Sequence, residues 1–237
     1  MWRTRFTLLA VAVLLMLAAN VAAQQPAGVK EAAAKAKAPT AVDRWESAIA
    51  AFEAEDEATP PPKNAVVFIG SSSIRLWDLK KSFPDLVALN RGFGGSQMPD
   101  AVQYARRIVT PYRPRLIVLY EGDNDLNAGK SPTQVAADFD QFLKIVRAEL
   151  PTTPLVVIGM KPSPSRWKII EQQRETNRLL ADRCATDGKA RFLDVERPML
   201  GSDGQPKPEI FRADKLHLND EGYKIWNELL RPLLTAD

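Results

Sequence analysis

Cysteine and histidine are almost absent from this sequence, which contains one of each in 237 residues. The single cysteine, Cys184, excludes an internal disulfide. The single histidine, His217, is the one candidate if the protein uses an imidazole as a general base, because imidazole exchanges protons near neutral pH. Acidic residues gather at Glu121, Asp123 and Asp125, but the ligand spacing of a calcium loop does not follow them, so we expect no bound metal ion.

An excess of either charge is also lacking. Lysine and arginine together number 32, against 29 aspartate and glutamate residues. The two signs are evenly mixed along the chain, which is typical of a solvated surface. Residues 1–23 hold two arginines and no acid, so their removal would leave a net charge of about +1. This balance gives no support to nucleic-acid binding.

Long apolar runs are rare, and the longest lies near the N-terminus. Two arginines precede twelve apolar residues, Leu8 to Ala19, and small residues follow as far as Ala23. This pattern predicts a secretory signal peptide over residues 1–23, because the run is shorter than the roughly 20 residues that a spanning helix needs. We therefore expect cleavage near Ala23 and a secreted or periplasmic protein with no stable membrane anchor.

The rest of the chain divides into a tether and one domain. Residues 24–41 are rich in Gln, Ala, Lys and Pro and predict a flexible tether. Residues 42–237 are enough for one hydrophobic core and too few for two full-sized ones. A short amphipathic helix carrying Trp45, Ile49 and Phe52 is expected to open this domain.

Short apolar runs alternate with longer helical patterns in the domain. Apolar stripes at helical spacing run from Val102 to Tyr112, from Val135 to Leu150 and from Tyr223 to Leu233, with Ser131 as a capping residue before the second and Asn219 before the third. Alternation of strand and helix predicts a parallel sheet covered on both faces. The five strands are predicted at Val66–Ile69, Leu86–Leu89, Leu116–Tyr120, Leu155–Ile158 and Arg191–Leu193.

Polar clusters follow the first three strands, and a fourth cluster lies near the C-terminus. They read Gly70-Ser71-Ser72-Ser73, Asn90-Arg91-Gly92-Phe93-Gly94-Gly95-Ser96, Glu121-Gly122-Asp123-Asn124-Asp125 and Asp214-Lys215-Leu216-His217. In this order they resemble the blocks of the SGNH, or GDSL-type, hydrolases, which read Gly-Asp-Ser, a lone glycine, Gly-x-Asn-Asp and Asp-x-x-His. The resemblance spans residues 66 to 230, and its specificity lies in the ordered set, because each block alone is short.

The resemblance implies a role for five residues. Ser72 would be the nucleophile, Asp214 and His217 the rest of a catalytic triad, and Gly95 and Asn124 the donors to an oxyanion. A serine hydroxyl needs a base to take its proton as it attacks, and the base needs an acceptor to hold its other ring nitrogen. The sequence contains no Gly-x-Ser-x-Gly, which argues against the nucleophile elbow of the α/β-hydrolases.

One position departs from the family pattern. Ser71 stands where family members usually have aspartate, so Ser71 and Ser73 remain alternative nucleophiles. The three serines could instead cap the helix that carries Ile74 and Trp77. Arg166, which follows the fourth strand, is a candidate substrate contact, with a plain solvated loop as the alternative.

Together these patterns predict a secreted serine esterase that needs no cofactor. The resemblance implies a three-layer α/β/α sandwich with a mainly parallel five-stranded sheet in flavodoxin-like order, and an acyl-enzyme on Ser72. Short acyl or acetyl esters, including those on carbohydrate, are the expected substrates, since no long apolar lid is visible to hold a lipid chain. The alternatives are an O-acyltransferase, a lysophospholipase or thioesterase, and a non-catalytic carbohydrate-binding domain.

Overall fold

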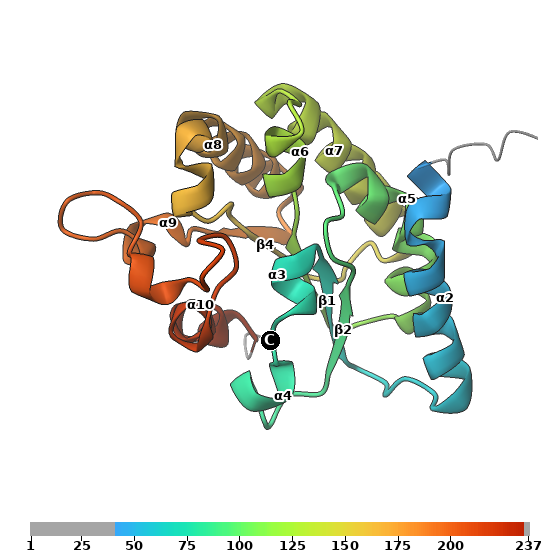
Figure 1. Ribbon diagram of the computed structural model, residues 1–237. Helices are drawn as coiled ribbons and strands as arrows, with labels where there is room; N and C mark the ends of the chain where they lie inside the picture. Colours follow the sequence, from blue (N-terminus) through green and yellow to red (C-terminus); the bar gives the residue numbers. More distant parts are fainter. Residues whose placement is uncertain (1–40, 235–237) are drawn as a thin grey trace, which may run out of the picture. The chain divides into compact units, whose positions relative to one another are not determined.

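The computed structural model describes residues 41–234 of the chain (Figure 1). The predicted signal peptide over residues 1–23 and residues 24–40 of the predicted tether lie outside the described residues, and Ala41, the last residue of that tether, begins the first described helix. No helix among residues 41–234 is both long enough and apolar enough to cross a membrane.

Five parallel strands form a single sheet in the order β2-β1-β3-β4-β5. This is the flavodoxin-like order, so the predicted fold class is confirmed. The strands are β1 (Val66–Gly70), β2 (Ala88–Gly92), β3 (Leu116–Tyr120), β4 (Leu155–Ile158) and β5 (Ala190–Leu193).

Helices cover both faces of the sheet, as Figure 1 shows. One face packs against α2 (Ala41–Ala58), α5 (Met98–Ile108), α7 (Pro132–Glu149) and α8 (Ile170–Asp187). The other packs against α3 (Ser72–Arg75), α4 (Leu79–Ser82), α9 (Glu196–Met199) and α10 (Asp220–Leu234). The remaining elements are α6 (Asp123–Asn127) and three 3-10 turns, η1 (Thr110–Tyr112), η2 (Pro164–Ile169) and η3 (Pro208–Ile210).

Successive residues of the strands belong to opposite cores. Val67 and Ile69 of β1 pack with α2, α5 and α7, whereas Val66 and Phe68 pack with α3, α4 and α10. This alternation follows from the period of two in a strand, and burial on both faces explains why β1 is apolar throughout. Each large apolar side chain removed from water contributes roughly 1.5–3 kcal/mol, so these two cores are the main source of stability.

Two predicted elements differ from the structure by more than one residue at an end, the second strand and the helix predicted from Val102. The second strand was predicted at residues 86–89 but runs from Ala88 to Gly92. It lies at the sheet edge and carries Arg91, whose charge is paired with Asp56 of α2, so a polar stretch is stable there. The stripe from Val102 to Tyr112 breaks after Ile108, because Pro111 cannot donate the hydrogen bond that would continue the helix.

Helix α2 is held against the rest of the domain by apolar and charged contacts. Ile49 is fully buried, with Trp45 and Phe52 packed around the same core. Arg107 of α5 binds two carboxylates of α2, with Nη1 2.7 Å from Glu46 and Nη2 2.6 Å from Glu53. The position of α2 relative to the sheet is therefore defined along its length.

Candidate active site

The carboxyl ends of β1, β2 and β3 meet at one edge of the sheet. Gly70 of β1 lies beside Gly92 of β2 and Tyr120 of β3 in the parallel register. The segments that follow these strands, 71–73, 93–96 and 121–125, therefore leave the sheet side by side. This edge is where open parallel sheets bind their ligands.

Of the three consecutive serines, Ser72 is the one that meets the histidine. Its Oγ lies 2.9 Å from Nε2 of His217, a residue 145 positions away in sequence. Ser71 and Ser73 are buried, at 3% and 2% exposure, whereas Ser72 is partly exposed. Ser71 occupies the N-cap position of α3 but its side chain makes no capping hydrogen bond, and α3 ends at Arg75. The structure thus places Ser72, rather than either neighbour, in position to be activated.

Asp214 accepts three hydrogen bonds, two from His217 and one from Leu216. Its Oδ2 lies 2.6 Å from Nδ1 of the imidazole, while Oδ1 accepts from the backbone N–H groups of Leu216 and His217 at 2.9 Å each. A left-handed turn at Lys215, with φ of 58°, lets the chain fold back over this carboxylate. The Asp-x-x-His spacing therefore forms a tight turn in which both oxygens of the Asp214 carboxylate accept hydrogen bonds.

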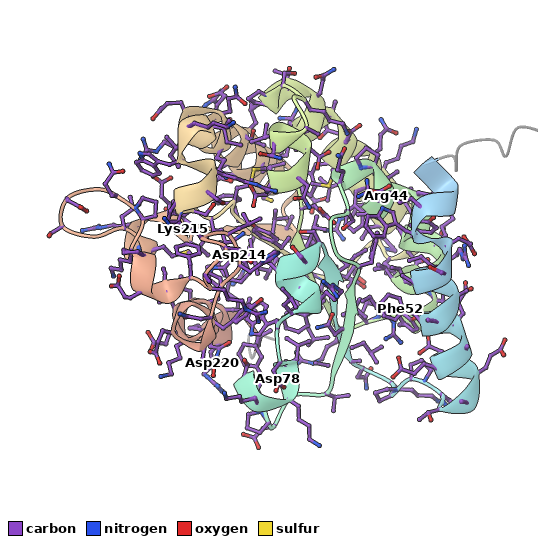
Figure 2. All side chains as sticks on the ribbon, viewed as in Figure 1. Arg44, Phe52, Asp78, Asp214, Lys215 and Asp220 are labelled. Atoms are coloured by element: carbon purple, nitrogen blue, oxygen red, sulfur yellow. The ribbon has the colours of Figure 1, made fainter. Side chains whose placement is uncertain are left out.

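The two contacts of the His217 imidazole indicate which of its ring nitrogens carries the proton. Nδ1–H donates to Asp214, which leaves Nε2 as an acceptor for the Ser72 hydroxyl proton. Burial opposes ionisation of Asp214, but the hydrogen bonds from His217 and Leu216 outweigh it and hold the pKa of this carboxyl well below its usual range. Asp214 is therefore an anion that can stabilise an imidazolium. Figure 2 shows Asp214 and Lys215 on the loop that precedes α10.

Gly95 and Asn124 lie where an oxyanion could be bound. Gly95 has φ of +85°, a conformation that a side chain would strain, and its N–H donates to no acceptor among residues 41–234. Asn124 lies in α6 and donates from Nδ2 to the carbonyl oxygen of Ser96 at 2.8 Å, which leaves the second hydrogen of that amide for a ligand. Gly95 follows β2 and Asn124 follows β3, the two strands that flank β1 in the sheet.

Arg166 is buried and bonded to protein groups. It is 8% exposed, and its Nη2 donates to Oδ1 of Asn124 at 2.8 Å while Nη1 lies 2.7 Å from Oδ1 of Asp123. Since Asn124 accepts on Oδ1, its donor Nδ2 is turned to the opposite side. Arg166, a candidate substrate contact in the sequence analysis, therefore orients the amide of Asn124 in this structure.

A buried polar cluster supports these groups and was not anticipated from the sequence. Lys161, 1% exposed, donates to the Tyr120 hydroxyl at 3.1 Å and to Asp123 at 3.3 Å, and Gln173 donates to Asp123 at 3.0 Å. Burial lowers the pKa of Lys161, and Asp123 and the nearby Asp214 oppose that shift. The sequence signal for this cluster was Lys161, three residues after the apolar strand β4, at the sheet edge where polar residues gather.

Glu121 lies under the loop that carries Gly95. It is 1% exposed and accepts a hydrogen bond from the Ser96 hydroxyl, while its other oxygen has no partner among the described residues. Burial raises the pKa of Glu121 well above its usual range, against the lowering effect of the Ser96 hydrogen bond. The side chain is therefore favoured in its protonated form, which can also donate to Ser96.

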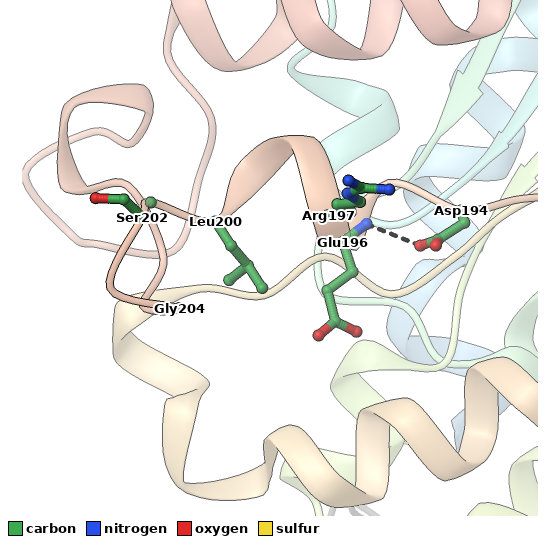
Figure 3. A pocket seen from close by; sticks show the side chains of 7 residues that line it. Asp194, Glu196, Arg197, Leu200, Ser202 and Gly204 are labelled. Atoms are coloured by element: carbon green, nitrogen blue, oxygen red, sulfur yellow. Dashed lines mark hydrogen bonds between the residues drawn. The ribbon is translucent and has the colours of Figure 1, made fainter.

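A separate open hollow of about 630 Å³ lies beyond the end of β5 (Figure 3). Asp194 accepts there from the backbone N–H of Glu196 at 2.9 Å. Neither Ser72 nor His217 lines this hollow. Its residues are Asp194, Glu196, Arg197, Leu200, Gly201, Ser202 and Gly204.

Comparison with known proteins places this geometry among ester-cleaving enzymes. Residues 75–225 match the model of the GDSL-like lipase/acylhydrolase family. This segment contains Gly95, Asn124, Asp214 and His217, and Ser72 lies just before it. The platelet-activating factor acetylhydrolase IB subunit alpha1 of Bos taurus is 30% identical over 210 residues, covering 82% of this chain and 85% of that protein, and the Homo sapiens protein is also 30% identical.

Solved structures share the fold at lower identity. A GDSL-like lipase from Bacteroides thetaiotaomicron superposes with a TM-score of 0.66 at 20% identity, covering 78% of this chain and 96% of that one. An acetylxylan esterase from Geobacillus stearothermophilus superposes with a TM-score of 0.59 at 12% identity, covering 73% of this chain and 95% of that one.

Proposed function

The chain belongs to the GDSL-like lipase/acylhydrolase family and is an ester-hydrolysing serine hydrolase, and from this premise we propose that it removes short acyl groups through an acyl-enzyme on Ser72. The observation that carries the proposal is the continuous contact from Ser72 through His217 to Asp214, with separations of 2.9 Å and 2.6 Å. These distances allow proton transfer without rearrangement of the side chains.

The reaction would proceed in two displacements. Ser72 Oγ attacks the ester carbonyl while its proton passes to Nε2 of His217, and negative charge develops on the carbonyl oxygen. The N–H groups of Ser72 and Gly95 and the amide of Asn124 would donate to that oxygen. When the carbon–alkoxy bond breaks, the proton on His217 goes to the departing alcohol. Water then attacks the acyl-serine, giving its proton to His217, and the acid leaves as Ser72 Oγ regains that proton.

The surface favours a small or polar substrate over a long acyl chain. Among the described residues Val87 is the one large apolar side chain that is exposed, at 49%. A long acyl chain needs apolar surface to leave water, at about 25 cal/mol per Å². The names of the related acetylhydrolase and acetylxylan esterase agree with an acetyl or other short acyl group, including one carried by carbohydrate.

Export of the protein is part of the same proposal. Two arginines, a twelve-residue apolar run and small residues up to Ala23 support cleavage of a signal peptide there. Expression of the whole sequence with determination of the mature N-terminus tests this. A new terminus near residue 24 in the secreted or periplasmic fraction is expected, and an intact N-terminus in the cytoplasm would contradict export.

Hydrolysis of 4-nitrophenyl esters of increasing acyl length tests the reaction. We expect rapid release of nitrophenol from the acetyl and butyryl esters and a fall in kcat/KM for long chains. Repeating the reaction with a polyol acceptor distinguishes hydrolysis from acyl transfer, because a transferase would form the polyol ester in place of the free acid. Failure to cleave any ester, with no labelling by a fluorophosphonate, would instead indicate a binding domain.

A further inference from the structure

Two arginines from different helices lie against the loop that carries the oxyanion glycine. Arg75 of α3 packs on Gly94, so closely that a Cβ built on that glycine would lie 2.6 Å from Arg75 Nε and 3.0 Å from its Nη2. The space that a side chain at residue 94 would need is filled by this guanidinium. Gly94 does not have a positive φ, so the contact with Arg75 is the feature that distinguishes this position.

Arg44 of α2 approaches the next residue of the same loop. Its Nη2 lies 3.7 Å from the Cβ position of Gly95, and its guanidinium stacks on the ring of Trp45 at 4.6 Å from the centroid. Trp45 is itself held edge-on against Phe93 at 5.8 Å between ring centroids. The charged end of Arg44 thus lies over an aromatic ring that is itself packed, near the start of α2, which Figure 1 labels; Figure 2 labels Arg44.

Neither arginine is neutralised by a described side chain. Both are exposed, and no carboxylate among residues 44–234 forms an ion pair with Arg44 or Arg75. Asp214, the acidic member of the proposed triad, is bound to His217. In the buried cluster beside Asn124, Lys161 and Arg166 share the single carboxylate of Asp123, so this cluster adds further positive charge.

Accordingly, we propose that Arg44 and Arg75 form an anion-recognition site beside the oxyanion loop, and that the natural ester carries an anionic oxygen group such as a carboxylate, sulfonate or phosphate. This inference rests on the proposed function, because it names the substrate class of that same site. The two guanidinium groups border consecutive residues of the loop that follows β2, Arg75 at Gly94 and Arg44 at Gly95. Guanidinium is suited to this role because it donates to such oxygens in a planar fork.

Three esters test the proposal and locate the charge. 4-Nitrophenyl butyrate is neutral, 4-nitrophenyl hemisuccinate carries a carboxylate on the acyl side, and 4-acetoxybenzenesulfonate carries a sulfonate on the alcohol side. The variants are Arg44→Gln, Arg75→Gln and the double substitution, with Arg191→Gln as the matched control. Arg191 is an exposed arginine near the amino end of β5, away from the edge that carries Ser72.

We expect the ratio of kcat/KM for one anionic ester to that for the neutral ester to fall about tenfold with each substitution, the size expected for a lost charge-assisted hydrogen bond. The ester that shows this fall identifies the charged side of the substrate. In wild type the ratio should also shrink near 1 M salt, where screening acts within about 3 Å. Arg191→Gln should keep both the ratio and its salt dependence.

An unchanged ratio for both anionic esters in the double variant would overturn the proposal while leaving ester hydrolysis intact. Calorimetric binding of the same esters to Ser72→Ala protein removes the dependence on turnover. Tighter binding of an anionic ester that is lost in Arg44→Gln/Arg75→Gln supports the site even if wild type cleaves none of the three. Equal binding of all three esters with and without the arginines would contradict it.

Discussion

Arg166 donates from Nη2 to Oδ1 of Asn124 across 2.8 Å and thereby determines which way the Asn124 amide faces. The same guanidinium binds Asp123 at 2.7 Å. The proposed oxyanion donor Asn124, on the short helix α6, is thus oriented by a residue of η2, the turn that follows β4, and the sequence alone did not reveal this contact.

Replacement of Arg166 by methionine should lower kcat and leave KM nearly unchanged. The amide of Asn124 would lose its orientation, and the loss of an entire oxyanion donor, about 10²–10³-fold in kcat, is the upper limit. Steady-state kinetics on 4-nitrophenyl acetate measures this. Arg166→Lys keeps a charge for Asp123 and should be less impaired. A rise in KM with unchanged kcat would instead support Arg166 as a direct substrate contact.

Substitution of single serines tests which hydroxyl reacts. Ser72→Ala should reduce kcat by about 10⁴-fold or more, because the nucleophile is lost. Ser73→Ala is the matched control, since Ser73 is buried and only its backbone carbonyl is engaged, by Tyr223 at 2.9 Å. Thermal unfolding of both variants verifies the fold. Loss of activity in Ser73→Ala with retention in Ser72→Ala would place the nucleophile one residue later.

Asp214→Asn should disable the base while preserving the loop. The amide oxygen can still accept from the N–H groups of Leu216 and His217, but the amide nitrogen cannot accept from Nδ1. The imidazole would then present the wrong tautomer, a change that costs about 10⁴-fold in kcat in the chymotrypsin-like example of such a triad. Because the pKa of Asp214 is lowered, this carboxyl stays ionised in mild acid and is not the cause of activity lost there. Retained activity in Asp214→Asn would contradict the assignment.

Glu121 should make stability depend on pH. Burial raises its pKa in the folded protein, so the unfolded chain binds fewer protons than the folded one above about pH 4.3. The contribution of Glu121 to the free energy of unfolding is fully present below that pH and is lost as the pH rises through the pKa that Glu121 has in the folded protein. Glu121→Gln cannot ionise, so its melting temperature minus that of wild type should increase from pH 5 to pH 8.

Differential scanning calorimetry at several pH values measures that difference, with Glu228→Gln on the exposed face of α10 as the control for the amide substitution. A gap that stays constant or shrinks as pH rises would show that Glu121 is not buried as an acid in the folded protein.

Local patterns in the sequence predicted those parts of the fold that depend on local interactions. Ser131 accepts from the backbone N–H of Gln134 at 3.3 Å, and Asn219 accepts from that of Gly222 at 3.1 Å, as the capping patterns before α7 and α10 predicted. The strand periodicity gave the parallel sheet, with an error at β2, where an edge position tolerates the polar Arg91. These features follow from residues that are close together along the chain.

The features that the sequence left open or did not predict depend on contacts between distant segments. The choice of Ser72 among three serines depends on a histidine 145 positions away. The role of Arg166 depends on Asp123 and Asn124, and the placement of Arg44 depends on the docking of α2 against β2 and α5. A sequence pattern records the type of each residue but not its contacts with distant segments. The four motif blocks could therefore be recognised from the sequence, whereas the residues that orient their side chains could not.

The central claim is that Ser72 is the nucleophile activated by His217, and labelling tests it most directly. The mature protein would be treated with a fluorophosphonate, digested and sequenced by mass spectrometry, beside a His217→Ala variant. The account predicts a single phosphonylated residue, Ser72, with labelling much slower in His217→Ala. A label on any other serine, or equal labelling rates in the two proteins, would contradict it.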